Sequence, residues 1–174
     1  MMKLQQLSKA IDSLNNWVGR KISWLSVVLI FVVCLDVLRR KLFSQTEAWI
    51  TELESHLFAL LFLFGAGYTF LHDRHVRVDV FFAKLSKKEK AWTNIAGIVL
   101  LLFPWCLLLI YWGIHYAWQS YLVSEDSPNP NGLPALYLIK LAIPLALSLL
   151  LLQGVSELIK SILIISEDNK TEIT

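Results

Sequence analysis

The stretch Trp49–Asp79, WITELESHLFALLFLFGAGYTFLHDRHVRVD, decides the fold of this chain. Its centre, Leu57–Leu71, carries no charged residue, while carboxylates precede it and arginines and histidines follow it. With Ser55 and His56 the uncharged run reaches 17 residues, the short end of what crosses about 30 Å of hydrocarbon. We therefore predict a membrane helix whose two ends lie in different aqueous compartments.

The composition also indicates a membrane protein. Hydrophobic residues make up 56% of the chain and charged residues only 17%, against roughly 25% charged residues in soluble domains. The net charge of +2 gives no support for nucleic-acid binding. Cys34 and Cys106 both lie in apolar runs, which is typical of packing residues rather than of a disulfide or a metal site.

Three further apolar runs repeat the pattern, so we predict an all-α integral membrane protein that forms one membrane domain over residues 1–174. The four predicted membrane helices span 22–38, 52–71, 91–121 and 134–160, and a polar tail follows at 161–174. The third run is longer than the roughly 20 residues that a perpendicular span needs. We expect this helix to be tilted, to protrude or to kink, with Pro104 as the kink.

The segment 1–21 is predicted to be an amphipathic helix rather than a signal peptide. Its apolar residues recur at spacings of three and four and are Leu4, Leu7, Ile11, Leu14 and Val18. Such a stripe fits an interfacial or docking helix, and it fits equally well a cytosolic extension of the first membrane helix.

A second surface segment follows Leu71, where an apolar stripe (Val78, Phe81, Phe82, Leu85) interrupts a basic sequence. We predict a short interfacial helix between the second and third membrane helices. The residues predicted to contact the membrane surface and lipid headgroups are His72, Arg74, His75, Arg77, Asp79 and Lys84.

Capping boxes are predicted at the starts of the second and third membrane helices. Ser44 and Glu47 have the required spacing, and so do Ser86 and Glu89.

Charged residues gather where the first two membrane helices meet. Asp36 precedes Arg39, Arg40 and Lys41 by about one turn, so we expect it to be salt-bridged rather than to be an ion site. Glu52 is close enough in sequence to meet Arg39 or Arg40 on the returning helix. The predicted cluster comprises Arg39, Arg40, Trp49, Glu52 and Glu54. It is interpreted as an ion-pair clamp between these helices, or between them and a partner.

The same residues resemble a known family. The matching pieces, in this order, are Arg39-Arg40, Trp49-x-x-Glu52, Gly65-Ala66-Gly67, His75-Val76-Arg77-Val78-Asp79, Ser127-Pro128, Leu133-Pro134 and Lys140. Their order and spacing resemble the small, DctQ-like membrane subunit of tripartite ATP-independent periplasmic (TRAP) transporters. Thr51 stands where members often carry the first of two acidic residues, so only Glu52 remains of that pair.

The resemblance implies an accessory scaffold subunit in a bacterial inner membrane. Its implied partners are a large multi-span membrane subunit, which carries the sodium and solute sites, a periplasmic solute-binding protein, and membrane lipids. No cofactor is expected in this chain. The implied solute is an organic acid, with sialic acid as the first candidate and a C4-dicarboxylate as the second.

The distribution of basic residues predicts the orientation. Four basic residues precede the first membrane helix, six lie between the second and third, and none lies between Glu125 and Gly132. By the positive-inside rule both termini are expected in the cytoplasm and the Glu125–Gly132 turn outside. The basic residues at 39–41 oppose this rule, and three nearby glutamates offset them.

The sequence also bears on other function classes. No catalytic motif supports an enzyme. His56 and His115 both fall toward the outer leaflet, where imidazoles from facing helices can hold a haem iron, so a four-helix cytochrome b-like protein is the alternative. A stand-alone channel or carrier normally has polar or broken helices near the midplane, whereas these runs are apolar at their centres.

Overall fold

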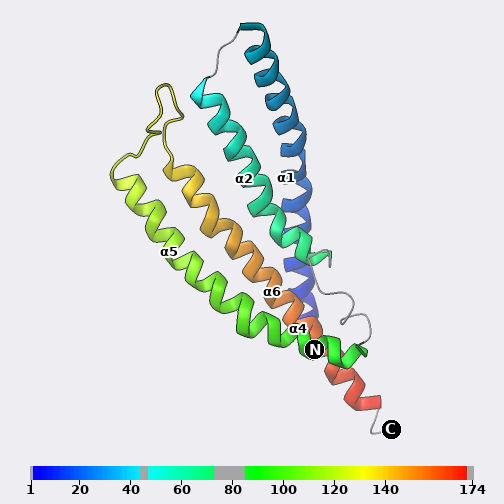
Figure 1. The fold of residues 1–174 in the computed structure, drawn as a ribbon. Helices are drawn as coiled ribbons and strands as arrows, with labels where there is room; N and C mark the ends of the chain where they lie inside the picture. Colours follow the sequence, from blue (N-terminus) through cyan, green and yellow to red (C-terminus); the bar gives the residue numbers. More distant parts are fainter. Residues whose placement is uncertain (1, 44–46, 73–84, 172–174) are drawn as a thin grey trace.

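A computed structural model describes residues 2–43, 47–72 and 85–171, and all regular structure in these ranges is helical. The elements are α1 (Met2–Phe43), α2 (Ala48–Leu71), α4 (Lys87–Gly97), the π-helix η1 (Ile98–Leu102), α5 (Phe103–Leu122) and α6 (Tyr137–Thr171) (Figure 1). Because α4, η1 and α5 form one continuous span, the described residues contain four helices long and apolar enough to cross a membrane. The predicted all-α membrane architecture is confirmed.

α6 is the central helix of the bundle. It contacts α1, α2, α4 and α5, and Figure 1 shows α1 and α5 on opposite sides of it. In its most apolar window 33% of the residues are buried, against 6% in the corresponding windows of α1 and α2. The outer helices instead expose large apolar side chains such as Phe62 and Leu101. This exposure fits a surface that faces lipid or a partner rather than water.

α1 is one continuous helix of 42 residues, which corresponds to about 63 Å at 1.5 Å per residue. The predicted boundary between residues 21 and 22 does not interrupt it. Its first half packs along the bundle, because Ser8, Ile11 and Asn15 are buried. Of the two interpretations of residues 1–21, the structure therefore favours an extension of the first membrane helix.

The other helices also differ from their predicted bounds. α2 begins at Ala48 instead of residue 52, and the third span covers Lys87–Leu122 instead of 91–121. α6 begins at Tyr137, so Pro134 lies in the preceding loop, and helical structure continues to Thr171 through most of the predicted tail. A change from apolar to polar sequence marks where the bilayer ends, and helical hydrogen bonding does not stop there.

The predicted capping box at Ser86 is confirmed. The Ser86 hydroxyl accepts a hydrogen bond from the Glu89 N–H at 3.3 Å, and the Glu89 carboxylate accepts one from the Ser86 N–H at 2.7 Å. The predicted capping box at Ser44 is wrong, because α2 begins at Ala48 and Glu47 is its N-cap residue, with an extended backbone and no side-chain cap bond. The predicted surface helix after Leu71 falls largely on residues outside the described ranges.

The third membrane helix bends between α4 and α5 (Figure 1). The π-helix η1 lies at this bend, and the Phe103 N–H bonds to the Ile98 carbonyl, five residues earlier. Pro104 follows immediately and lacks a backbone N–H. A π-helical turn is a recognised cause of kinks, so the deformation predicted at Pro104 is centred on the turn before it.

Two glycines allow α1 and α2 to approach closely. A Cβ at Gly19 would clash with Tyr68, and a Cβ at Gly67 would clash with Asn15. A Cβ at Gly65, by contrast, would meet no atom within 4 Å. Small residues at helix contacts are a general feature of membrane proteins, and among the described residues Gly67, but not Gly65, makes such a contact.

Candidate functional site

Polar side chains concentrate at the two ends of the bundle. We call the end that holds both chain termini the terminal end and the opposite end the loop end (Figure 1). At the loop end Asp36 is only 2% exposed and forms an ion pair with Arg40, one turn later on α1. Arg39 lies 3.4 Å from the Glu47 carboxylate at the start of α2. The predicted salt bridge of Asp36 is therefore present.

Glu54 adds a second carboxylate to this region. Its charge acts on Arg40, while its Oε1 atom is buried and has no hydrogen-bond partner among the described residues. The positive charge of the Arg40 guanidinium thus interacts with two carboxylates, those of Asp36 and Glu54. Trp49, the remaining member at the helix start, is 39% exposed.

Glu52 does not meet Arg39 or Arg40, so that part of the predicted cluster is wrong. Its carboxylate instead accepts hydrogen bonds from the Ser127 hydroxyl, from the Asn129 side-chain amide at 2.8 Å and from the Leu133 N–H at 2.6 Å. These donors all belong to the α5–α6 loop, which lies over the start of α2. Because Asp36 forms the ion pair with Arg40 within α1, the Glu52 carboxylate is available to bond to the α5–α6 loop.

The α5–α6 loop, residues 123–136, has further anchors. Lys140 of α6 is nearly buried, forms an ion pair with Glu125 and lies 4.1 Å from the centre of the Tyr116 ring. The ion pair with Lys140 lowers the pKa of Glu125. The Ala135 N–H donates to Asp126 at 2.8 Å. These contacts fix the loop as an ordered cap on the loop end.

At the terminal end a polar seam joins α1 to α6. Asp12 accepts from the Ser156 hydroxyl at 2.7 Å and from the Gln153 amide at 2.9 Å, and it lies 2.9 Å from the Lys160 ammonium. The Ser8 and Ser156 hydroxyls are 2.7 Å apart and both are buried. These contacts hold the protruding half of α1 against α6.

This polar seam is not among the predicted contacts. Ser8, Asp12 and Asn15 recur at helical spacing along α1, and Ser8 and Asp12 contact Gln153, Ser156 and Lys160, which have similar spacing on α6. A stripe of small and polar residues on one helical face was the available signal. The apolar stripe of residues 4–18 dominates the pattern of the same helix, so the polar stripe was not predicted.

Of the predicted headgroup contacts, only His72 lies within the described ranges. Its Nδ1 atom lies 3.0 Å from the Tyr68 carbonyl oxygen, and its ring lies on the Tyr68 ring at a centroid distance of 4.2 Å. His72 therefore caps the carboxyl end of α2. Arg74, His75, Arg77, Asp79 and Lys84 lie outside the described residues.

The two histidines of the cytochrome alternative are not brought together. His56 lies on α2 and His115 on α5, and α6 stands between these helices (Figure 1). His115 is exposed and makes an edge contact with Trp112 of its own helix. The geometry gives no facing pair of imidazoles.

The family description "Tripartite ATP-independent periplasmic transporters, DctQ component" matches residues 29–163, most of the 174-residue chain. The chain belongs to this family. No curated protein and no solved structure matches it. The chain is thus a small membrane component of a TRAP transporter and not an enzyme, and DctQ components act with a large membrane subunit and a periplasmic binding protein. The family and the four apolar helices indicate an inner-membrane protein.

The matched range of this DctQ component includes the loop-end residues Asp36, Arg40 and Glu52 and the whole α5–α6 loop. It begins after Asp12, so the α1 half of the terminal-end seam lies outside it.

Replacement of Glu52 by alanine is expected to release the α5–α6 loop. The Ser127 hydroxyl, the Asn129 amide and the Leu133 N–H all lose their acceptor at once. We expect limited proteolysis within residues 123–136 to accelerate roughly tenfold or more, because a hydrogen bond to a charged acceptor stabilises the folded loop more than a neutral hydrogen bond does. Ser55→Ala, which removes only a bond to the Thr51 carbonyl of the same helix, is the matched control and should leave cleavage unchanged. Equal cleavage of Glu52→Ala and wild type would mean that the loop is held by other contacts.

Proposed function

We propose that this DctQ component is the static scaffold subunit of a TRAP transporter, which supports the large subunit during sodium-driven, binding-protein-dependent uptake of an organic acid. The observation that carries this proposal is the placement of the polar contacts. They tie α1 to α6 at the terminal end and the α5–α6 loop to α2 at the loop end. A bundle fixed at both ends suits a stationary support for a moving carrier domain.

The solute is proposed from the resemblance, with sialic acid as the first candidate and a C4-dicarboxylate as the second. Sodium coupling is assigned to the large subunit. The described residues of this chain contain no group of three or more His, Cys, Asp and Glu side chains that could hold a metal ion. The identity of the binding protein decides between the two solutes.

The loop-end cluster is proposed as part of the interface with the large subunit, and its members are Asp36, Arg39, Arg40, Trp49 and Glu54. A shallow groove of about 360 Å³ between α1 and α2 is lined by Leu29, Val33, Glu54, Ser55 and Phe58. The unpartnered Glu54 Oε1 supports this assignment, because a buried carboxylate oxygen in hydrocarbon is costly without a donor. The predicted headgroup contacts from His72 to Lys84 remain proposals on the membrane surface.

A disulfide between α1 and α6 tests the static role. The Ser8 and Ser156 hydroxyl oxygens are 2.7 Å apart. The sulfur atoms of cysteines at these two positions should therefore lie close enough to form the S–S bond of about 2.05 Å. In a background that lacks Cys34 and Cys106, Ser8→Cys/Ser156→Cys should form a disulfide when the assembled transporter is oxidised. Because a static subunit needs no movement between α1 and α6, we expect uptake to be the same before and after oxidation.

The two single cysteine variants, oxidised in the same way, control for oxidative damage. Uptake that stops on oxidation of the double variant and returns on reduction would show that α1 and α6 must move. That result would contradict the scaffold proposal.

The proposed orientation places both termini in the cytoplasm. In the same cysteine-free background, Pro130→Cys in the exposed part of the α5–α6 loop should react with an impermeant thiol reagent added to spheroplasts. Lys87→Cys, also exposed, should react only after lysis. Labelling in the reverse order would invert the topology, and the positive-inside count would then be outweighed by another determinant.

A further inference from the structure

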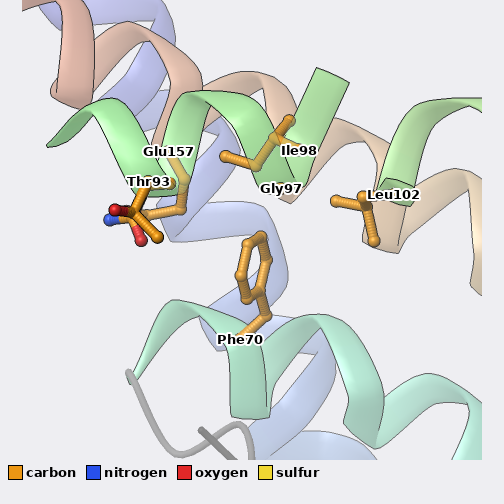
Figure 2. A pocket seen from close by; sticks show the side chains of 7 residues that line it. Phe70, Thr93, Gly97, Ile98, Leu102 and Glu157 are labelled. Carbon is orange, nitrogen blue, oxygen red and sulfur yellow. The ribbon is translucent and has the colours of Figure 1, made fainter. Parts of the chain in front are cut away.

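A cavity of about 210 Å³ opens at the terminal end, between the last turn of α2 and the first turns of the third membrane helix. Its lining residues are Phe70, Thr93, Asn94, Gly97, Ile98, Leu102 and Glu157. Figure 2 shows Thr93 and Glu157 together at one end, with Ile98 and Leu102 farther along and Phe70 across from them. A cavity with one polar and one apolar end fits an amphiphilic ligand.

The polar end lies at the level where the chain leaves the membrane. The charged first turn of α4 and the exposed Trp92 immediately precede Thr93. Tryptophan is enriched at the boundary between hydrocarbon and headgroups, and the uncharged run of α2 ends at Leu71, one residue after Phe70. A lipid at this depth places its headgroup at Thr93 and its acyl chain toward Leu102.

The polar end offers hydrogen-bond acceptors. The Thr93 hydroxyl donates its proton to the Glu89 carbonyl at 2.8 Å, so its lone pairs remain available. Glu157 is a carboxylate with several acceptor positions, of which the Lys160 ammonium at 2.6 Å occupies one. Lys160 is shared with Asp12, so one positive charge faces two carboxylates. Asn94 also lines this end and can both donate and accept, and the adjacent first turn of α4 carries Lys87, Lys88 and Lys90. The Glu157 carboxylate lines the cavity itself, and it favours a ligand group that is cationic and rich in N–H donors.

We propose that this cavity binds a phospholipid whose headgroup ends in a primary ammonium, such as phosphatidylethanolamine. The ammonium donates to Glu157 and Thr93, and the first methylenes of an acyl chain lie against Phe70, Ile98 and Leu102. The wide π-helical turn that begins at Ile98 shapes this wall, and such turns recur at functional sites. The proposal does not rest on the identity of the solute or on the scaffold role, although Glu157 shares Lys160 with Asp12 of the polar seam.

Gly97 provides a test that leaves the rest of the fold intact. A Cβ there meets no atom within 4 Å, so Gly97→Leu should extend into open space at the cavity wall. Gly65→Leu is the matched control, because a Cβ at Gly65 is equally free and Gly65 does not line the cavity. Circular dichroism should show the same helix content in both variants.

The measurement is native mass spectrometry of the delipidated subunit after incubation with phosphatidylethanolamine or phosphatidylglycerol in detergent. We expect wild type and Gly65→Leu to retain one phosphatidylethanolamine in preference to phosphatidylglycerol, and Gly97→Leu to retain neither specifically. Glu157→Gln should reduce the preference for phosphatidylethanolamine about tenfold, the effect of one charge-assisted hydrogen bond.

Three results would overturn the proposal. They are equal or stronger retention of phosphatidylglycerol by wild type, retention of phosphatidylethanolamine by a folded Gly97→Leu variant, and an unchanged preference in Glu157→Gln. If Gly97→Leu fails to fold, the Glu157→Gln measurement alone decides.

Discussion

We expect liposomes that contain only this DctQ component to take up no solute above the level of protein-free vesicles, even with a sodium gradient and loaded binding protein. Addition of the large subunit should start sodium-dependent uptake. The reason lies in the spans, which are long and apolar enough to cross a membrane and include uncharged runs such as Leu57–Leu71. A sodium ion or a carboxylate that crosses them alone would lose hydration without replacement, at a cost of many kcal/mol.

The control is the large subunit reconstituted without this chain, which separates a need for the scaffold from a need for the carrier. Uptake by the small chain alone would remove the basis for the scaffold proposal. Uptake by the large subunit alone, at the full rate of the pair, would show that this chain is dispensable for transport. The lipid proposal for the terminal-end cavity survives either result, because its test measures retention by the isolated subunit.

The number and type of helices could be predicted because hydrocarbon imposes a strict rule. Every backbone polar group in the bilayer must be bonded internally, so an uncharged run of sufficient length becomes a helix. Helix ends followed no such rule. α1 continues through residues 2–21 because Ser8 and Asp12 bond to Ser156 across the interface with α6. α6 likewise extends past residue 160 at the terminal end.

The contacts of the candidate site also fall into those that the sequence predicts and those that it does not. The Asp36–Arg40 pair follows from a spacing of four on one helix, which the sequence displays directly. The acceptor role of Glu52 depends on donors at Ser127, Asn129 and Leu133, far away in sequence. No local pattern connects them, because the fold of the α5–α6 loop decides which carboxylate it covers.

The two glycines in Gly65-Ala66-Gly67 are predicted to respond oppositely to replacement by alanine. A Cβ at Gly67 would clash with the Asn15 side chain, which is only 2% exposed and bonds to the Ile11 and Leu149 carbonyls at 3.4 Å. Asn15 has little room to move, so Gly67→Ala should lose about 2–3 kcal/mol through overpacking and lost hydrogen bonds. Gly65→Ala meets open space and should be neutral or gain up to about 1 kcal/mol from helix propensity.

Unfolding of the purified subunit by SDS titration in mixed micelles measures this difference directly, with helical circular dichroism as the signal. The double variant Asn15→Ala/Gly67→Ala separates the steric cause from a general cost of alanine at position 67. Because Asn15→Ala removes the clashing amide, the second substitution should then cost far less than it does in the wild-type background. Equal stabilities for Gly65→Ala and Gly67→Ala would contradict the close approach of α1 and α2 at Gly67.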